Sequence, residues 1–551
     1  MGQLMTAELD LCDEARMCER SASPMGAVPE ELANSGAPCG SGSACVTSAM
    51  LWGMEARPVR VEVSLSAGLP GIAIVGRPDT SVAEARSRVR CAIRAAGFTV
   101  PREAVTVNLA PSDMRKSGTA FDLPMALAIL AASGQIPSEG LERCLIVGEL
   151  SLRGGVGAVR GLLAYAELAR AMGLALVAPE GELAPRREPY VGRFVSSLAE
   201  LSTGVGDVGE TLEAPCDPRE CDEDPDFADV AGQEVAKRAL CVAAAGHLGV
   251  LMVGPPGVGK TMLSRCVPGI LPDLTDEEFF EASLVHSVAG VRERRLEARR
   301  RPFRLPHHSA STAGLVGGGR PVHPGEISLA HGGVLFLDEL GEFSGNVLQA
   351  LRQPLEERVV RIARVEGTYE FPCDFQLVAA SNPCPCGHLG DTGRTCTCTP
   401  AAIEAYRAKL VGPLIDRIDI VCSLERPRVD EMMGPKSGPS SAQMRQDVAA
   451  AREFAAWRHA RAKVTGASVS SEGEGGASRQ GRIARAVAEN ALSSEALRCL
   501  EDVAQRRFFS ARAVASCLRV SRVIADMERH EHVECDHVLE AVGYRDRTVT
   551  P

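Results

Sequence analysis

The octapeptide Gly254-Pro255-Pro256-Gly257-Val258-Gly259-Lys260-Thr261 decides the fold of this 551-residue chain. Its spacing is that of a P-loop, in which glycines let backbone N–H groups turn towards phosphates. The lysine reaches the β- and γ-phosphates, and the hydroxyl ligates Mg²⁺. The apolar run 249–253 predicts a buried strand before the loop, and residues 262–265 open a helix after it. The stretch therefore predicts an α/β fold with a parallel sheet and a site for ATP.

A second motif follows the first in the order expected for such a site. The apolar run 334–337 predicts a buried strand, and Asp338 and Glu339 come directly after it. Asp338 suits the Mg²⁺ shell, and Glu339 suits the orientation of an attacking water. We therefore expect ATP hydrolysis, with Thr261 and Asp338 holding Mg²⁺ and Glu339 as the catalytic carboxylate.

Asn382 is a further candidate, at the end of the apolar run 375–381. The carboxyl ends of parallel strands line the ligand crevice in open α/β sheets. Asn382 is therefore expected to help position the attacking water. Taken alone, such an asparagine would more often be a turn residue.

The composition limits the class of protein. A chain with 45% hydrophobic and 24% charged residues is typical of a globular protein, and its length suggests about three domains. No apolar run approaches the ~20 residues of a membrane span, and the N-terminus lacks the pattern of a secretory signal. Nineteen cysteines then indicate reduced thiols in the cytoplasm. The net charge of −11 argues against a generally basic nucleic-acid-binding surface but permits local basic patches.

Changes in composition predict five segments. They are a disordered extension over 1–45, an α/β domain over 46–202, an acidic linker over 203–225, an ATPase core over 226–427 and a helical region over 428–551. Within the second segment, alternation predicts a strand over 59–63, and the apolar run 71–75 predicts a buried strand. A further strand is expected over 105–109, and helices are expected over 81–96 and 122–132.

The order of these motifs resembles the magnesium-chelatase-like AAA+ ATPases, and among them the ComM (YifB) subfamily. Four stretches carry the match, at 68–71, 301–309, 325–331 and 382–387. The resemblance covers about Val46 to Gly543. It implies ATP-driven homo-hexameric rings and a DNA helicase that promotes branch migration in natural transformation, with single-stranded or branched DNA as the partner and no membrane. Two alternatives stay open, the ATPase subunit of a metal chelatase and a chaperone-like remodeller.

The same resemblance implies roles for two arginines. Arg417 lies where AAA+ proteins place a guanidinium that reaches the γ-phosphate of a neighbouring subunit. Arg512, near the start of a C-terminal helix, lies where a helical lid would touch the bound nucleotide. Without the two motifs before them, both would be taken for arginines of surface salt bridges.

The segment 46–202 resembles the proteolytic domain of Lon-type proteases, with two departures from the family pattern. The nucleophilic serine of that family falls at Ala120, and its catalytic lysine falls at Leu163. Alanine offers no nucleophile and leucine no base, and nothing evident supplies a base to nearby Ser117. We therefore expect a proteolytically inactive domain kept as a structural or binding module.

Two cysteine pairs follow Asn382. They are Cys384 with Cys386, and Cys396 with Cys398, with His388 between the pairs. Four sulfurs can close a tetrahedral structural Zn²⁺ site and fix the loop. The C-x-C spacing is less common than C-x₂-C, so four reduced surface cysteines remain an equal alternative.

Two arginine-rich stretches are candidates for DNA contact. Residues 292–304 hold seven arginines against two glutamates, a local charge of +5 (7 − 2). Few aromatics accompany them, so contact with the phosphate backbone is favoured over base stacking. A second stretch, 358–365, predicts a hairpin strand whose alternation places its arginines on both faces, which makes it the weaker candidate. The alternative in each case is a solvated surface.

Overall fold

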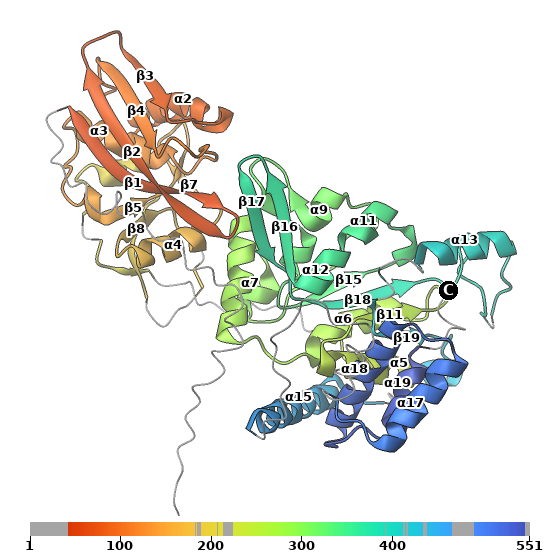
Figure 1. Cartoon of the computed structure of the whole chain (residues 1–551). Helices are drawn as coiled ribbons and strands as arrows, with labels where there is room; N and C mark the ends of the chain where they lie inside the picture. The colour runs from red at the N-terminus through yellow and green to blue at the C-terminus, as the bar shows by residue number, and fades with distance from the viewer. Residues whose placement is uncertain are drawn as a thin grey trace, which may run out of the picture.

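The computed structural model describes most of the chain from residue 42 onwards. The described residues are 42–181, 183–184, 189–206, 208–212, 224–391, 393–410, 414, 417–433, 438–464 and 490–545. Figure 1 shows an N-terminal α/β domain (red to yellow), an ATPase module (green to cyan) and a group of C-terminal helices (blue). No helix among the described residues has the length and apolar character of a membrane span.

An eight-stranded sheet forms the N-terminal domain, with the strand order β10-β9-β8-β5-β1-β2-β4-β3. β1 pairs antiparallel with β2 along its whole length, while β3 and β4 pair parallel. The strands are β1 (Ser43–Trp52), β2 (Glu55–Ser66), β3 (Gly71–Val75), β4 (Ala104–Ala110), β5 (Cys144–Ile146), β8 (Ala175–Ala178), β9 (Tyr190–Phe194) and β10 (Thr211–Leu212). The helices are α2 (Thr80–Ala95), α3 (Asp122–Ala132) and α4 (Leu162–Ala171), and β6 (Glu149–Leu150) and β7 (Val156–Gly157) form a separate ribbon.

The structure corrects two predicted boundaries of this domain. β1 begins at Ser43, so the first domain starts before the predicted residue 46, and residues 1–41 of the predicted extension lie outside the described residues. β10, inside the predicted linker 203–225, pairs antiparallel with β9. The N-terminal sheet therefore extends beyond residue 202. Two residues are too few to show an alternating pattern, so only the pairing identifies this strand.

The ATPase module is built on a five-stranded sheet in the order β12-β15-β18-β11-β19, with every neighbouring pair parallel. Its strands are β11 (Val250–Val253), β12 (Phe303–Arg304), β15 (Val334–Leu337), β18 (Gln376–Ser381) and β19 (Ile420–Ser423). Every residue of β11, β15 and β18 is buried, as expected for parallel strands covered on both faces. Because the strands are parallel, their carboxyl ends meet at one edge, where the predicted motifs lie.

Helices and two hairpins surround this sheet. The longer helices are α5 (Glu234–Gly246), α6 (Lys260–Ile270), α7 (Asp276–Ala289) and α13 (Pro400–Leu410). The shorter ones are α8 (Arg294–Glu297), α9 (Thr312–Val316), α10 (Glu326–Leu329), α11 (Gly345–Ala350) and α12 (Arg352–Glu357). The hairpins are β13 (Gly317–Gly318) with β14 (His323–Pro324), and β16 (Val359–Arg364) with β17 (Gly367–Pro372).

The C-terminal region is helical, with α15 and α18 packed against α5. Its helices are α14 (Val429–Met433), α15 (Ser441–Val464), α17 (Ser494–Arg506), α18 (Ala511–Met527) and α19 (Cys535–Gly543). Side chains of α15, α18 and α19 share one buried cluster with β11 and α6. These helices are therefore anchored on the module that carries the P-loop.

The N-terminal domain docks on the ATPase module through α4 and α7, which lie next to each other. The backbone N–H of Gly161 donates to the carbonyl of Ser287 at 2.7 Å, and that of Leu163 donates to the Ser287 hydroxyl at 3.1 Å. The Leu163 side chain is buried in one cluster with Phe279 and Phe280 of α7. The position that the Lon resemblance assigns to a lysine is thus part of an apolar interface.

The β16–β17 hairpin makes a second contact with the N-terminal domain. The Trp52 and Tyr369 rings stack with their centroids 4.6 Å apart. In Figure 1 this hairpin stands beside the end of the β1–β2 ribbon. A cavity of about 560 Å³ lies between the two parts of the molecule. Both domains line it, with residues that include Ser117, Ala120, Arg160, Arg320, His323 and Arg364.

Candidate functional site

The P-loop joins β11 to α6 as the sequence predicts. Gly257 and Gly259 have positive φ angles of 79° and 96°, a region that favours glycine. The Lys260 ammonium donates to the carbonyl oxygens of Gly254 and Pro255 at 2.6 and 3.0 Å and to Asn382 Oδ1 at 3.0 Å. Burial lowers the pKa of Lys260 to about 8, against the opposing attraction of two nearby carboxylates. The ammonium therefore lies over the loop in which phosphates would sit.

A hydroxyl and two carboxylates lie beside this lysine. Thr261 Oγ1 donates to Asp338 Oδ2 at 3.0 Å, and the backbone N–H of Glu339 donates to Asp338 Oδ1 at 2.9 Å. Glu339 adopts a left-handed φ of 51°, and its side chain is half-exposed. The oxygens of Thr261 and Asp338 suit Mg²⁺, which prefers oxygen ligands.

His308, which lies within the family-matching stretch 301–309, is also at this site, although the sequence motifs assign it no catalytic role. Its Nδ1 is 3.3 Å from Glu339 Oε2. It follows β12, the strand that pairs with β15, and so its loop opens at the same edge as Glu339. Recognising the two-residue strand β12 beside β15 would have indicated this neighbour.

The structure gathers five of the predicted site residues into one place: Lys260, Thr261, Asp338, Glu339 and Asn382. Arg417 lies elsewhere, before the amino end of β19, where it forms an ion pair with Glu356 and keeps only 14% of its side chain exposed. Arg512 is exposed in the first turn of α18, which Ser510 caps. The roles of Arg417 and Arg512 stay predictions.

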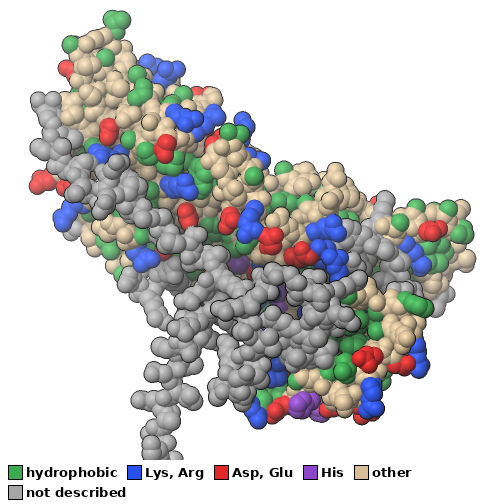
Figure 2. All heavy atoms as spheres, in the orientation of Figure 1, with side chains coloured by type: hydrophobic (Ala, Val, Ile, Leu, Met, Phe, Trp, Pro, Cys, Tyr) green, Lys and Arg blue, Asp and Glu red, His purple; other side chains and the backbone are tan. Residues whose placement is uncertain are grey.

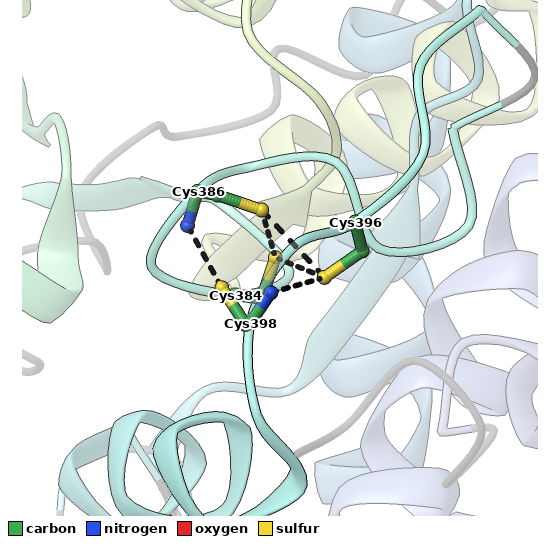
Figure 3. A group of neighbouring side chains, drawn as sticks. All are labelled: Cys384, Cys386, Cys396 and Cys398. Atoms are coloured by element: carbon green, nitrogen blue, oxygen red, sulfur yellow. Dashed lines mark hydrogen bonds between the residues drawn. The ribbon is translucent and has the colours of Figure 1, made fainter.

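The four predicted cysteines converge in the loop after β18 (Figure 3). Their sulfur atoms all lie within 4.8 Å of one another. The Sγ distances are 3.5 Å between Cys384 and Cys386, 3.7 Å between Cys384 and Cys396, and 3.6 Å between Cys386 and Cys396. Backbone N–H groups of the loop lower the pKa of the Cys386 thiol to about 5, the His388 N–H first among them. The cluster can hold a metal ion.

The arginine-rich stretch 292–304 is largely ion-paired, and its role as a DNA-contact surface stays a prediction. Six of its seven arginines form ion pairs: Arg292 with Glu297, Arg295 and Arg300 with Asp224, Arg299 with Asp276, Arg301 with Glu278, and Arg304 with Glu293 and Glu326. With these six carboxylates counted, the local charge falls from +5 to +1 (7 − 6). The stretch is chiefly a structural ion-pair network, because acids from other segments neutralise it.

Four arginines around the interdomain cavity have a different environment. None of Arg115, Arg160, Arg320 and Arg364 pairs with a carboxylate among the described residues, and all four are exposed. Arg160 donates to His323 at 2.9 Å. On the face drawn in Figure 2, basic and acidic side chains alternate without forming one large basic patch.

The fold and the site define a P-loop protein of the AAA+ class. Three family models match the chain: magnesium chelatase, subunit ChlI, over residues 226–432; subunit ChlI of Mg-chelatase over 61–182; and magnesium chelatase, subunit ChlI C-terminal, over 438–545. The match thus includes the N-terminal domain, the ATPase module and the C-terminal helices.

Similar whole proteins narrow the class. YifB of Escherichia coli is 40% identical over 506 residues, which cover 90% of this chain and 95% of that protein. Competence protein ComM of Haemophilus influenzae is 38% identical over 513 residues, which cover 91% and 97%. Lon protease 2 of Bacillus subtilis is 28% identical over 187 residues, 29% of this chain and 33% of that protein. The chain belongs to the magnesium-chelatase-like AAA+ family, and within it to the ComM/YifB subfamily.

Proposed function

We propose that this protein is an ATP-driven DNA motor of the ComM type, a helicase that works as a ring of six copies in the cytoplasm and promotes branch migration in recombination or natural transformation. The observation that carries the proposal is the assembled nucleotide site in a chain that is 38% identical to competence protein ComM over nearly the whole length of both. The segments 226–427 and 428–551 would act as ATPase core and helical lid.

ATP and Mg²⁺ are the proposed cofactors. The backbone of residues 254–261 would cradle the phosphates, with Lys260 on the β- and γ-phosphates. Thr261 and Asp338 would hold Mg²⁺. Structural Zn²⁺ at the four clustered cysteines is part of the same proposal.

Hydrolysis would depend on a positioned water. Glu339 is the proposed catalytic carboxylate, Asn382 helps to orient the water, and His308 positions the Glu339 side chain. Arg417 lies before the amino end of β19, whereas the P-loop follows the carboxyl end of the parallel strand β11. The two therefore lie at opposite edges of the sheet, so Arg417 would act on the nucleotide of a neighbouring subunit. Arg512 would contact nucleotide from the lid.

The arginines of the interdomain cavity are the proposed DNA-contact residues in place of the stretch 292–304. Lysine and arginine side chains that contact phosphate release counterions, so DNA binding should weaken steeply with salt. Arg320 and Arg364 belong to two hairpins of the ATPase module, and Arg160 belongs to the N-terminal domain. The N-terminal domain, which we propose to be Lon-like and proteolytically inactive, would then help to hold the DNA strand.

A metal-chelatase ATPase subunit is the second candidate, favoured by the names of the matching family models. The two candidates differ in their response to DNA. The deciding experiment measures ATP turnover with no DNA and with single-stranded, duplex and branched DNA. Stimulation by branched or single-stranded DNA, lost in an Arg320→Ala, Arg364→Ala double variant, supports the motor. An ATP turnover rate that is the same without DNA and with every form of DNA would refute the DNA motor.

A further inference from the structure

The four-cysteine loop packs directly on the nucleotide site. Gly387, between the two cysteine pairs, has a φ of +80°. A Cβ atom on Gly387 would come within 2.9 Å of Pro256 Cδ in the P-loop and 3.7 Å of Asn382 Cγ. A contact as short as 2.9 Å forces a neighbour to move. The backbone of this loop therefore fills the space beside both the P-loop and Asn382.

The far part of the loop is fixed at a second point. The Asp391 side chain is fully buried and accepts hydrogen bonds from Arg426 Nε and Nη2 at 3.2 and 2.9 Å. His388 Nδ1 also lies 3.1 Å from Asp391. Arg426 follows β19, which is paired with β11, the strand that leads into the P-loop. The loop thus runs from the carboxyl end of β18 past the P-loop, which follows β11, to a residue that follows β19.

The sulfur geometry identifies a ligand for the cluster. Sulfur atoms 3.5 to 3.7 Å apart are not bonded to one another, because a disulfide bond is about 2.05 Å long. Zn²⁺ binds thiolate at about 2.3 Å, so the edges of a ZnS₄ tetrahedron are about 3.8 Å. The three distances among Cys384, Cys386 and Cys396 come close to that edge, and Cys398 Sγ lies within 4.8 Å of the other three sulfurs. The backbone N–H groups of Cys386 and Cys398 also donate to sulfur atoms of the cluster, at 3.4 Å each.

We propose that Cys384, Cys386, Cys396 and Cys398 bind one Zn²⁺, and that the metal-bound loop holds Asn382 and the P-loop in the arrangement that hydrolysis requires. Asn382 accepts a hydrogen bond from Lys260, so a shift of the loop would displace Asn382 and, through this bond, Lys260 of the P-loop. Gly387 acts as a positioning residue in this scheme. The second half of the proposal rests on the proposed ATPase activity, whereas the metal site does not.

The Asp391–Arg426 contact fixes only the far part of the loop, so a bound metal would fix the part that carries the four cysteines. Metal binding joins the two cysteine pairs through one ion and so restricts the chain between them. Apart from Cys384, none of the four cysteines is fully buried, so a hydrophobic core cannot replace the metal. Loss of Zn²⁺ would therefore release the Gly387 contact.

The metal site is tested on the full-length protein purified without chelator. We expect about one Zn²⁺ per chain by elemental analysis. After exchange with Co²⁺, we expect the near-ultraviolet absorption that cobalt thiolates give. A Cys386→Ser, Cys398→Ser double variant should lose both signals. Cys91→Ser, which changes a half-buried cysteine of α2, should keep them. Protein that binds neither ion, or a double variant that binds both normally, overturns the metal site.

The positioning role is tested with two glycines of the same loop. Gly387 and Gly390 have φ angles of +80° and +77°, so alanine costs the backbone about the same at either position. A Cβ on Gly390 meets nothing within 4 Å. We expect both alanine variants to retain Zn²⁺. We expect Gly387→Ala to lower kcat for ATP roughly tenfold or more relative to Gly390→Ala, since misplacement by about 1 Å can cost a hundredfold.

The outcomes separate this inference from the proposed function. Equal kcat in the two glycine variants refutes the positioning role, whether or not DNA stimulates ATP turnover. If the wild-type protein hydrolyses ATP at a rate that DNA does not change, the DNA motor is refuted. The zinc site and the positioning role of Gly387 are then unaffected. A wild-type protein without any ATP turnover refutes the positioning role together with the ATPase, and the metal measurements still decide the site.

Discussion

Arg301→Ala should destabilise the ATPase module far more than Arg299→Ala, although the two arginines are close in sequence. Arg301 has only 9% of its side chain exposed. It donates to the carbonyl oxygens of Pro272 and Gly332 at 2.6 Å each and also pairs with Glu278. A hydrogen bond to a charged group contributes about 1.5–3 kcal/mol, so the loss of the two short ones costs roughly 3–6 kcal/mol in free energy of unfolding.

Arg299 is the matched control for this prediction. It pairs with Asp276 through side chains that are 52% and 83% exposed, and such a pair contributes about 0–1 kcal/mol. By thermal unfolding, the apparent midpoint of the module should fall by roughly 6–24 °C in Arg301→Ala and by less than about 4 °C in Arg299→Ala. Equal midpoint shifts would refute the ion-pair network. DNA affinity should be unchanged in Arg299→Ala, and a marked loss would restore the stretch 292–304 as a DNA-contact surface.

Four further predictions concern the nucleotide site. Lys260→Ala should abolish ATP binding, whereas Glu339→Gln should bind ATP and stop turnover, because the lysine meets phosphate charge and the carboxylate acts on water; near-normal hydrolysis in Glu339→Gln contradicts that role. Wild-type protein should take up about half a proton per ATP bound at pH 8, because burial lowers the pKa of Lys260 to about 8 and bound phosphate oxygens raise that pKa again. Calorimetry in buffers of different ionisation enthalpy measures this proton uptake. Proton release on ATP binding would contradict the prediction. Inactive Arg417→Ala subunits should regain turnover when mixed with Lys260→Ala subunits, and failure in rings shown to be mixed would exclude action on a neighbour. His308→Ala should lower kcat roughly tenfold with ATP affinity unchanged, and a loss of affinity instead would place His308 in binding.

Patterns within one segment could be predicted from the sequence. The strand over 71–75 and the helix over 122–132 have the predicted bounds, but the strand was predicted to be buried and instead lies at the edge of the sheet with none of its residues buried. Their signals are local, since a run of apolar residues or a helical period lies wholly inside the element. The P-loop was likewise identified from one octapeptide, and its flanking strand and helix have the predicted order.

Features that depend on other segments could not be predicted. The charge of residues 292–304 was counted along the chain, but Asp224, Asp276, Glu278 and Glu326 reach the arginines from other segments. The contact between His308 and Glu339 depends on the pairing of β12 with β15 in the same way. The cysteine spacing left metal and free thiols equally open, and only the convergence of the four sulfurs favours metal.

The positions that the Lon resemblance assigns to protease chemistry now serve packing. Ala120 and Leu163 are 7% and 1% exposed. A lysine at position 163 would place an ammonium among the aromatic side chains of α7, and burying a charge without a partner is strongly unfavourable. Leucine at position 163 therefore supports the interface at the position where the Lon resemblance would place a base. Because α7 follows the P-loop helix α6 directly and also bonds to α4 through Ser287, one helix connects the nucleotide site to the N-terminal domain. A movement of α6 on ATP binding would consequently reach the interdomain cavity through α7.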